Sequence, residues 1–157
     1  LSYLKNTILI HLTARWLHQR YSEEDLLSLI KKMIEKKLKI ILTTDESTKN
    51  KFPKLFTIYK TISHDCIEEA VFKNEVFILD NLNLIELAEL VNNIDIVLTP
   101  ECGLLHIAGM CGCKLIVIYN GYYYPKMMMA EYSPWEKDYF QLISTEDNLN
   151  NKILNLI

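Results

Sequence analysis

The chain has 157 residues, with 17 Lys and Arg against 20 Asp and Glu, a formal net charge of −3, and 50% apolar residues. This composition excludes an intrinsically disordered or collagen-like chain and predicts a single globular domain over residues 1–157. The sequence also lacks the basic stretch of a general nucleic-acid binder, the cationic start of a signal peptide, and the apolar run of about 18 residues that a membrane span needs.

Apolar strands and amphipathic helices alternate from the start of the chain. Residues 7–13 are a nearly continuous β-branched and leucine run, which predicts a strand buried on both faces. Residues 22–37 carry apolar side chains at helical spacing, and Ser22 with Asp25 predicts a capping box at the helix start. We then expect a strand at 38–44, a weak helix at 48–53, a helix at 64–72 and a short strand at 76–79.

The second half of the chain continues this alternation. Residues 83–93 predict a helix that Asn83 and Glu86 cap. The remaining expected elements are a strand at 94–98 that ends at Pro100, a helix from Gly103 to Met110, a strand at 114–119, an irregular segment at 120–135, a strand at 139–143 and a helix at 146–157.

Strands that alternate with helices favour a parallel sheet with right-handed crossovers. We therefore predict an α/β fold, a Rossmann-like doubly wound parallel sheet of about six strands. In such sheets the ligand lies beyond the carboxyl ends of the strands, near the point where the strand order reverses. The candidate site segments are accordingly residues 11–20, 43–45, 80–83, 99–106 and 120–124.

The four cysteines do not indicate a metal site. Cys66, Cys102, Cys111 and Cys113 match no standard zinc-binding spacing, so we expect no bound metal. Without a secretory signal, we interpret them as reduced thiols.

The most informative segment runs from Leu98 to Cys113, with the sequence LTPECGLLHIAGMCGC. A strand ends there, a tight turn follows, and a helix begins whose free backbone N–H groups favour an anion. Gly103 lets a phosphate approach the backbone closely, and Glu101 can accept hydrogen bonds from sugar hydroxyls. The alternative is that Glu101 only caps the helix and Gly103 only serves the turn.

This segment resembles the donor-binding half of bacterial glycosyltransferase family 9, the heptosyltransferases of the lipopolysaccharide core. The family carries Asp-(Ser/Thr)-Gly-x-x-His-(Ile/Leu)-Ala after a strand, and this chain has Glu101-Cys102-Gly103-Leu104-Leu105-His106-Ile107-Ala108. At the start, Ile8–Thr13 leads through Arg15 and Arg20 to Tyr21-Ser22-Glu23-Glu24, where the family has an apolar strand, a basic loop and Trp-Pro-Glu-Glu. The strand at 114–119 and its Gly- and Pro-containing loop correspond to a third family region.

The resemblance implies the C-terminal half of a glycosyltransferase-B fold, which binds a nucleotide sugar, typically ADP-heptose. The transfer would invert the anomeric centre without a metal or another cofactor. The resemblance places the catalytic base and the acceptor glycolipid in an N-terminal domain that we expect to be absent from this chain, so we expect no catalytic residue here and no turnover by the chain alone. It also implies lipopolysaccharide synthesis in the cytoplasm, with peripheral association at the inner face of the bacterial inner membrane.

The chain departs from the family pattern at three places. The family Asp is Glu101, its Ser/Thr is Cys102, and the Lys that it places just before Trp-Pro is missing from the stretch His18–Ser22. The only two arginines, Arg15 and Arg20, lie in the loop between the first strand and the first long helix. We expect Arg20→Ala to weaken nucleotide binding more than Arg15→Ala, because Arg20 is nearer the Lys position. The expected donor-binding residues are Thr13, Arg15, Arg20, Glu101, Cys102, Gly103, Leu104, His106, Asn120 and Gly121.

Several of these residues have a structural alternative. For His106 the alternative is a buried, hydrogen-bonded structural role, and for His11 it is a packed position in the strand. The Tyr- and Met-rich stretch at 122–129 can stack a base or form an interface. Two other functions remain open: a non-catalytic Rossmann-like binding or assembly module with a degenerate site, and half of a sugar-nucleotide epimerase, although the phosphate turn typical of the latter is absent.

Overall fold

The computed structural model describes residues 4, 6–73, 75–134 and 139–157. Its strands are β1 (Thr7–His11), β2 (Lys39–Thr44), β3 (Thr61–Ile62), β4 (Val76–Asp80), β5 (Ile96–Pro100), β6 (Lys114–Tyr119) and β7 (Tyr139–Ile143). Its helices are α1 (Arg15–His18), α2 (Glu23–Glu35), α3 (Glu46–Lys49), α4 (Pro53–Ile58), α5 (Ile67–Lys73), α6 (Leu84–Asn92), α7 (Gly103–Cys111), α8 (Pro125–Glu131) and α9 (Leu149–Leu156).

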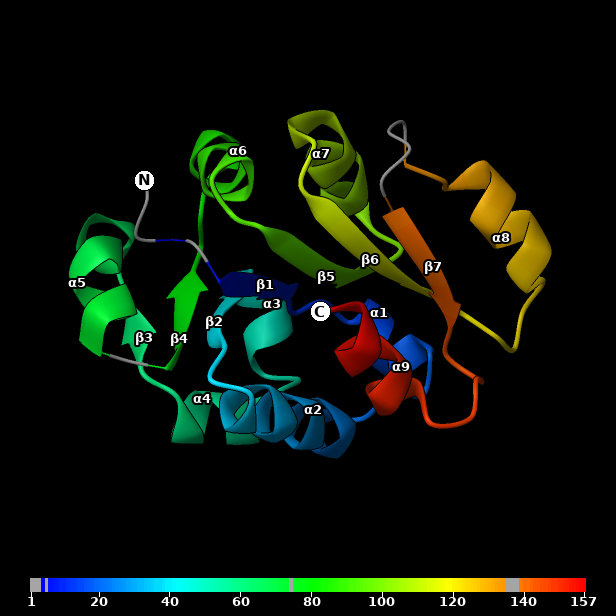
Figure 1. Cartoon of the computed structure of the whole chain (residues 1–157), viewed down its shortest axis with the longest axis horizontal. Helices are drawn as coiled ribbons and strands as arrows, with labels where there is room; N and C mark the ends of the chain where they lie inside the picture. The colour runs from blue at the N-terminus through cyan, green and yellow to red at the C-terminus, as the bar shows by residue number, and fades with distance from the viewer. Residues whose placement is uncertain (1–3, 5, 74, 135–138) are drawn as a thin grey trace.

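In the described part of the chain, seven strands form one sheet in the order β3-β4-β2-β1-β5-β6-β7 (Figure 1). Every neighbouring pair is parallel. The chain moves outward from β1 to β2 and on to the edge strand β3, and β4 then pairs between β3 and β2. It returns to β5 beside β1 and continues outward to β6 and β7. This arrangement confirms the predicted doubly wound α/β fold and places the reversal of strand order between β1 and β5.

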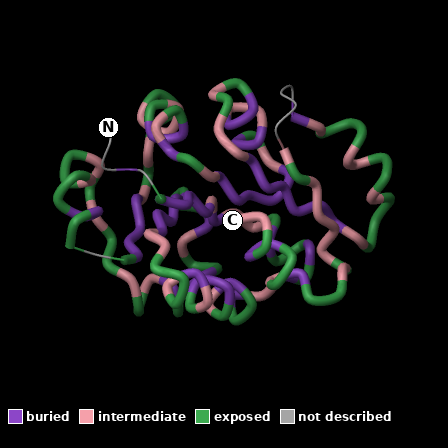
Figure 2. The backbone as a smooth tube through the Cα atoms, in the orientation of Figure 1, coloured by how far each residue is buried: buried purple, intermediate pink, exposed green. Residues whose placement is uncertain are grey.

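Each strand contributes side chains to two separate core clusters, because successive residues of a strand point to opposite faces. In β1, Ile8 and Ile10 pack into one cluster with residues of α2, α4 and α9, whereas Leu9 packs into the other with residues of α5, α6 and α7. The two helix layers therefore cover both faces of the sheet, with buried residues concentrated along the strands (Figures 1 and 2). The continuous apolar character of the strands follows from this double coverage.

The two predicted capping boxes are confirmed. Ser22 Oγ accepts from Asp25 N at 3.1 Å, and the Asp25 carboxylate accepts from Ser22 N at 2.8 Å, at the start of α2. Asn83 and Glu86 make the same reciprocal pair before α6, at 3.0 and 2.8 Å. Both boxes satisfy backbone donors that the first helical turn leaves unpaired.

Three expectations about the elements were wrong. The short edge strand β3 was not predicted, because two residues carry no periodicity. The single helix expected at 48–53 is two helices, since Asp45 accepts from Thr48 N at 2.8 Å to start α3, and Pro53 begins α4 rather than ending a helix. The segment 120–135 contains α8, which also begins at a proline, Pro125, while the end of that segment lies outside the described residues.

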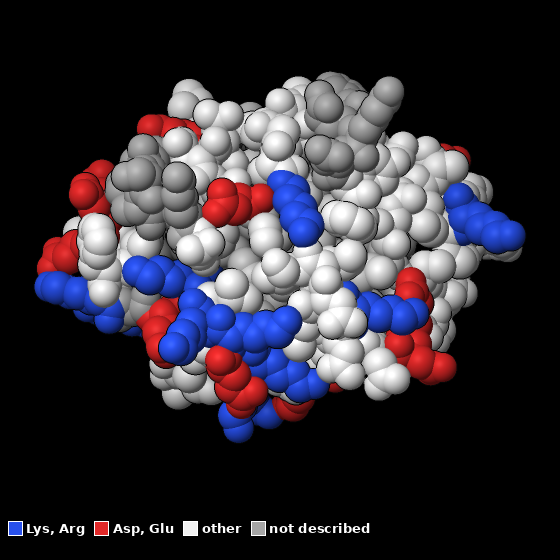
Figure 3. Space-filling model, viewed as in Figure 1, with Lys and Arg blue, Asp and Glu red and all other residues white. Residues whose placement is uncertain are grey.

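Charge is distributed unevenly over the face that Figure 3 shows. Lysines and carboxylates alternate along the side formed by α2 and α4, whereas the surface over β7 and α8 carries few charges. The exposed large apolar side chains of residues 120–134 and 139–143 are Tyr122, Tyr123, Tyr124, Met127, Tyr132 and Phe140. Within the described residues, no helix is both long enough and apolar enough to cross a bilayer.

Candidate functional site

The candidate site lies where the strand order reverses. The loop after β1 and the turn after β5 leave the carboxyl edge of the sheet side by side, because β1 pairs with β5. The first segment forms α1 and continues to Arg20, and the second contains Glu101 and Cys102 before α7. This is the position in which doubly wound sheets bind their ligands.

A buried glutamine joins these two segments. The Gln19 side-chain amide donates from Nε2 to the Glu101 carboxylate and also to the Ile118 carbonyl oxygen, at 2.9 Å in the second case. Gln19 is 1% exposed and Glu101 is 6% exposed. The Glu101 backbone N–H donates to the same Ile118 carbonyl at 3.3 Å, so both the backbone and the side chain of Glu101 are fixed.

The environment of Glu101 makes ionisation less favourable than it is in water. Burial raises the pKa of this carboxyl above its ordinary value, while the positive charge of Arg15 and the hydrogen bond from Gln19 oppose that shift in part. Desolvation thus outweighs the nearby cation. A ligand hydroxyl group that donates to Glu101 would stabilise the ionised form.

The N-terminus of α7 is open to solvent. Its N-cap residue Cys102 is extended and makes no side-chain capping hydrogen bond. Instead Cys102 Sγ lies 3.2 Å from Thr99 Oγ1, and burial raises the pKa of the Cys102 thiol. Gly103 is exposed, and a Cβ atom added there would meet no heavy atom within 4 Å. Leu105 N donates to the Cys102 carbonyl oxygen at 3.2 Å, and the backbone of Leu104 and Leu105 acts on the Cys102 thiol, so an anion would approach this end of the helix through the open space at Gly103.

Two expected donor-binding residues of α7 lie farther from this opening. The Leu104 side chain is 3% exposed and packs in the core, so only its backbone faces the site. His106 lies one turn into α7 and is half-buried.

The loop after β6 serves mainly to brace the site. Asn120 Nδ2 donates to the His18 carbonyl at 3.2 Å, and Asn120 Oδ1 accepts from Tyr122 N at 2.8 Å. A Cβ atom at Gly121 would lie 2.1 Å from Thr145 Oγ1 and 2.6 Å from Ile143 Cγ2. Glycine is required there because the loop after β7 packs against its backbone.

The structure separates the two arginines. Thr13 Oγ1 accepts from Arg15 N at 2.9 Å at the start of α1, and the Arg15 charge acts on Glu101. The guanidinium of Arg20 instead lies 4.2 Å from the ring centroid of Tyr122, a cation–π contact. Of the two, Arg15 is therefore the one whose charge acts on the residue directly before the N-cap of α7.

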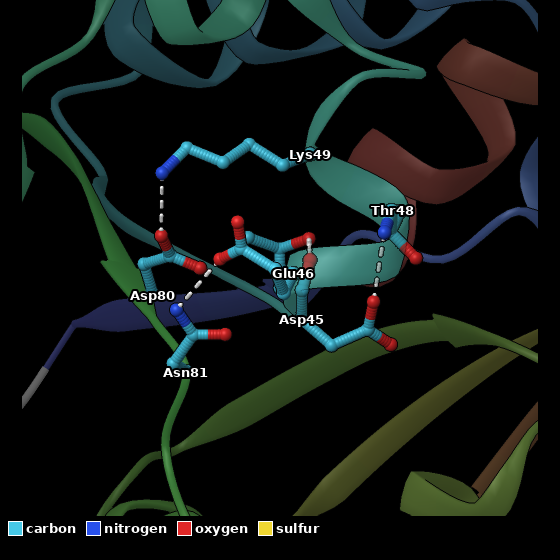
Figure 4. A network of polar contacts seen from close by, with 7 residues as sticks. Asp45, Glu46, Thr48, Lys49, Asp80 and Asn81 are labelled. Atoms are coloured by element: carbon cyan, nitrogen blue, oxygen red, sulfur yellow. Dashed lines mark hydrogen bonds and ion pairs between the residues drawn. The ribbon is translucent and has the colours of Figure 1, made fainter.

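A second polar group lies at the carboxyl ends of β2 and β4 (Figure 4). Lys49 Nζ lies 2.9 Å from Asp80 Oδ2, and Asn81 Nδ2 donates to Glu46 Oε2 at 3.1 Å. Sequence position selected Asp80 and Asn81 but missed Glu46 and Lys49, because both lie on α3, beyond the expected site segment 43–45. Lys49 compensates the charge of Asp80, and the Asn81 amide donates to the remaining carboxylate, Glu46.

His11 lies at the end of β1, between these two groups. Its Nδ1 is 2.9 Å from Thr43 Oγ1, and burial lowers its pKa to about 4 despite the opposing charge of Asp45. The imidazole is therefore neutral near neutral pH. Among the residues that the structure describes, no cluster of three or more His, Cys, Asp or Glu side chains has the arrangement of a metal site.

Comparisons with known proteins agree with this architecture. The profile of glycosyltransferase family 9 (heptosyltransferase) matches residues 2–153. No individual sequence among curated proteins matches the chain. Three solved structures have the same fold. Escherichia coli ADP-heptose lps heptosyltransferase II is 14% identical, with a TM-score of 0.67 over 96% of this chain and 44% of its own.

The other two similar structures cover the chain equally well. Escherichia coli heptosyltransferase WaaC with ADP is 12% identical, with a TM-score of 0.66 over 99% of this chain and 44% of its own. A glycosyl transferase family 9 protein from Veillonella parvula is 12% identical, with a TM-score of 0.58 over 95% of this chain and 38% of its own. The chain thus spans less than half of the length of each relative.

Proposed function

The chain belongs to glycosyltransferase family 9, and from this membership we propose that it binds the nucleotide-sugar donor of a glycosyl transfer, as the C-terminal half of a glycosyltransferase-B enzyme. The observation that carries the proposal is the uncapped N-terminus of α7 at the reversal of strand order, with Gly103 open in front of it.

The diphosphate of the donor would lie against the first turn of α7. Backbone N–H groups and the positive end of the helix dipole favour a phosphate there, and they would stabilise the negative charge that develops on the leaving nucleotide. Arg15 would add a full positive charge beside this position. Because the charge is stabilised by backbone groups and an arginine, the transfer would need neither a metal nor another cofactor.

Glu101 would bind the hydroxyl groups of the ribose or the sugar. Its carboxylate is held in place by Gln19 and lies directly before the N-cap residue of α7. A carboxylate that is fixed before the ligand arrives loses little conformational entropy on binding. Thr13, Cys102 and Asn120 would support the surrounding loops rather than contact the donor through charged groups.

The donor class is proposed from the relatives. One of them is described as bound to ADP and another as an ADP-heptose enzyme, so we propose an ADP-linked sugar. Transfer with inversion to a lipopolysaccharide acceptor, at the cytoplasmic face of the inner membrane, would then need a second domain for the acceptor and the catalytic base.

A thermal-shift series with ADP, UDP, GDP and CMP tests the proposal. A nucleotide at about 100 times its dissociation constant adds about 2.7 kcal/mol to the free energy of unfolding, a shift of several degrees for this length. We expect a shift with ADP that disappears in Gly103→Trp, where the indole fills the open space before α7. A shift with a different nucleotide would change the donor, and no shift with any of them would contradict donor binding.

One observation favours the non-catalytic alternative. The Glu101 carboxylate and the Asn120 amide already have internal partners, which a degenerate site would show. In that case none of the four nucleotides would shift the melting temperature.

A further inference from the structure

We propose that the cavity between α2 and the start of α9 is a binding site for the phosphate group of a small molecule, separate from the opening of α7. The inference goes beyond the proposed function and does not depend on it. Its anchor is Arg20, with Lys32 on the facing helix.

The cavity has a volume of about 340 Å³. It lies where the loop after β1, the loop after β7 and α9 meet. Its lining is mostly polar and consists of Arg20, Tyr21, Asp25, Lys32, Ser144, Asn148, Leu149, Asn150 and Asn151. Neither Glu101 nor Gly103 belongs to this lining, so the cavity is distinct from the site at α7.

Arg20 is one of the residues that line this cavity. Within residues 4, 6–73, 75–134 and 139–157, no carboxylate or carbonyl oxygen accepts a hydrogen bond from that guanidinium. In that part of the chain the guanidinium contacts the ring of Tyr122, with Arg20 Cζ 4.2 Å from the ring centroid. Stacking on an aromatic ring fixes the plane of the guanidinium while leaving its N–H groups directed outward.

The backbone of Arg20 is also unusual. Its φ is +57°, directly after α1, at a position where helices commonly end on glycine or asparagine. A side chain with a Cβ is strained in this region. The chain therefore carries an arginine where the backbone disfavours a side chain with a Cβ, as it also does at Lys37 after α2.

The second cation of the cavity is also without an ionic partner. Lys32 Nζ donates to Asn151 Oδ1 at 3.3 Å, and in the described part of the chain it makes no ion pair. The one carboxylate of the lining, Asp25, is occupied, because it accepts from Ser22 N at 2.8 Å and from Ser22 Oγ at 2.7 Å. The lining therefore holds two cations and one carboxylate, a formal net charge of +1, and the carboxylate already accepts hydrogen bonds from Ser22.

The wall between these cations is held in place by hydrogen bonds. The Tyr21 hydroxyl pairs with Asn150 Oδ1, and Asn150 Nδ2 donates to the Asp25 carbonyl at 3.5 Å. Ser144 Oγ accepts from Gly121 N at 3.1 Å. A planar guanidinium and an ammonium across a preformed polar cavity suit the tetrahedral oxygens of a phosphate, and the volume leaves room for the group that carries it.

An NMR titration of the ¹⁵N-labelled chain with inorganic phosphate, at constant ionic strength, tests this site. We expect saturable shifts of the amide signals of Ser144 and residues 148–151. Arg20→Asn removes the guanidinium and tolerates the left-handed backbone, and Lys32→Gln removes the second cation. Each should raise the dissociation constant for phosphate by about tenfold. Lys31→Gln, an exposed neighbour outside the cavity, is the matched control and should bind phosphate like the parent.

Acetate serves as the carboxylate probe and should bind more weakly than phosphate. Linear shifts that do not saturate, equal affinities for the parent and Arg20→Asn, or tighter binding of acetate would each overturn the proposal. Because the readout is the amides of the loop after β7 and of α9, its failure is distinguishable from a failure of ADP to bind at Gly103.

Discussion

The Gln19 amide and the Glu101 carboxylate form a buried hydrogen bond across the reversal of strand order. One partner follows β1 and the other follows β5, so this contact links the two halves of the sheet at its carboxyl edge. It also fixes the residue that directly precedes the N-cap of α7, and with it the opening at which we propose the donor binds.

Replacement of Gln19 should destabilise the fold. In Gln19→Ala the buried Glu101 carboxylate loses its side-chain donor, and we expect the free energy of unfolding to fall by about 1–3 kcal/mol. Urea denaturation measures this change. His18→Ala, at an exposed position one residue earlier, is the control and should leave the free energy of unfolding within about 0.5 kcal/mol of the parent. An equal loss in both variants would contradict the bridge.

The Glu101→Gln variant should gain stability relative to the parent chain as the pH rises. Burial raises the pKa of Glu101, so the folded chain holds its proton more tightly than the unfolded chain does, and ionisation costs stability. The variant has no charge to bury. Its melting temperature relative to the parent should therefore increase as the pH rises above 4.5, the ordinary pKa of a glutamate. Glu89→Gln, on the exposed surface of α6, should show no such trend.

His11 should make the fold sensitive to acid. Its pKa is lowered from 6.5 to about 4 in the folded chain, so the unfolded chain binds the proton first. This contribution to stability is present above pH 6.5 and is lost as the pH falls toward 4, with a slope of up to about 1.4 kcal/mol per pH unit. His11→Gln should show a shallower decline in denaturation experiments over that range. Identical pH profiles for the variant and the parent would exclude this role.

The two arginines should differ in their effect on nucleotide binding. Sequence position favours Arg20, whereas the structure brings the charge of Arg15 to Glu101 and directs Arg20 to Tyr122. We therefore expect Arg15→Ala to weaken ADP binding by about tenfold and Arg20→Ala to weaken it less. Calorimetric titration distinguishes these outcomes. A larger loss in Arg20→Ala would restore the assignment made from sequence position.

Regular periodicity made most of the fold predictable. The strand at 114–119, the strand at 139–143 and the capping boxes at Ser22 and Asn83 all follow from local pattern, because strand burial and helix caps are set by neighbouring residues. Strand β3 and helix α8 were not predictable in this way. The first is too short to show a period, and the second begins at a proline inside an aromatic stretch.

The edge of the sheet that carries the candidate site was predictable, but the contacts within it were not. Residues after each strand were correctly expected at one edge of the sheet, since parallel strands share that edge. The contact of Gln19 with Glu101 joins residues 82 positions apart, and the cavity lined by Arg20 and Lys32 depends on where α9 packs against α2. Such contacts depend on tertiary packing, which no local pattern encodes.

The most direct test of donor binding is the dissociation constant of ADP for the parent, Gly103→Trp and Met110→Trp, measured by calorimetry. Met110 is exposed at the opposite end of α7, so its replacement controls for the added indole. We predict that ADP binds the parent and Met110→Trp with the same affinity and that Gly103→Trp loses binding. Equal affinity for all three proteins, or no binding to the parent, would contradict the assignment of the α7 N-terminus as the donor site.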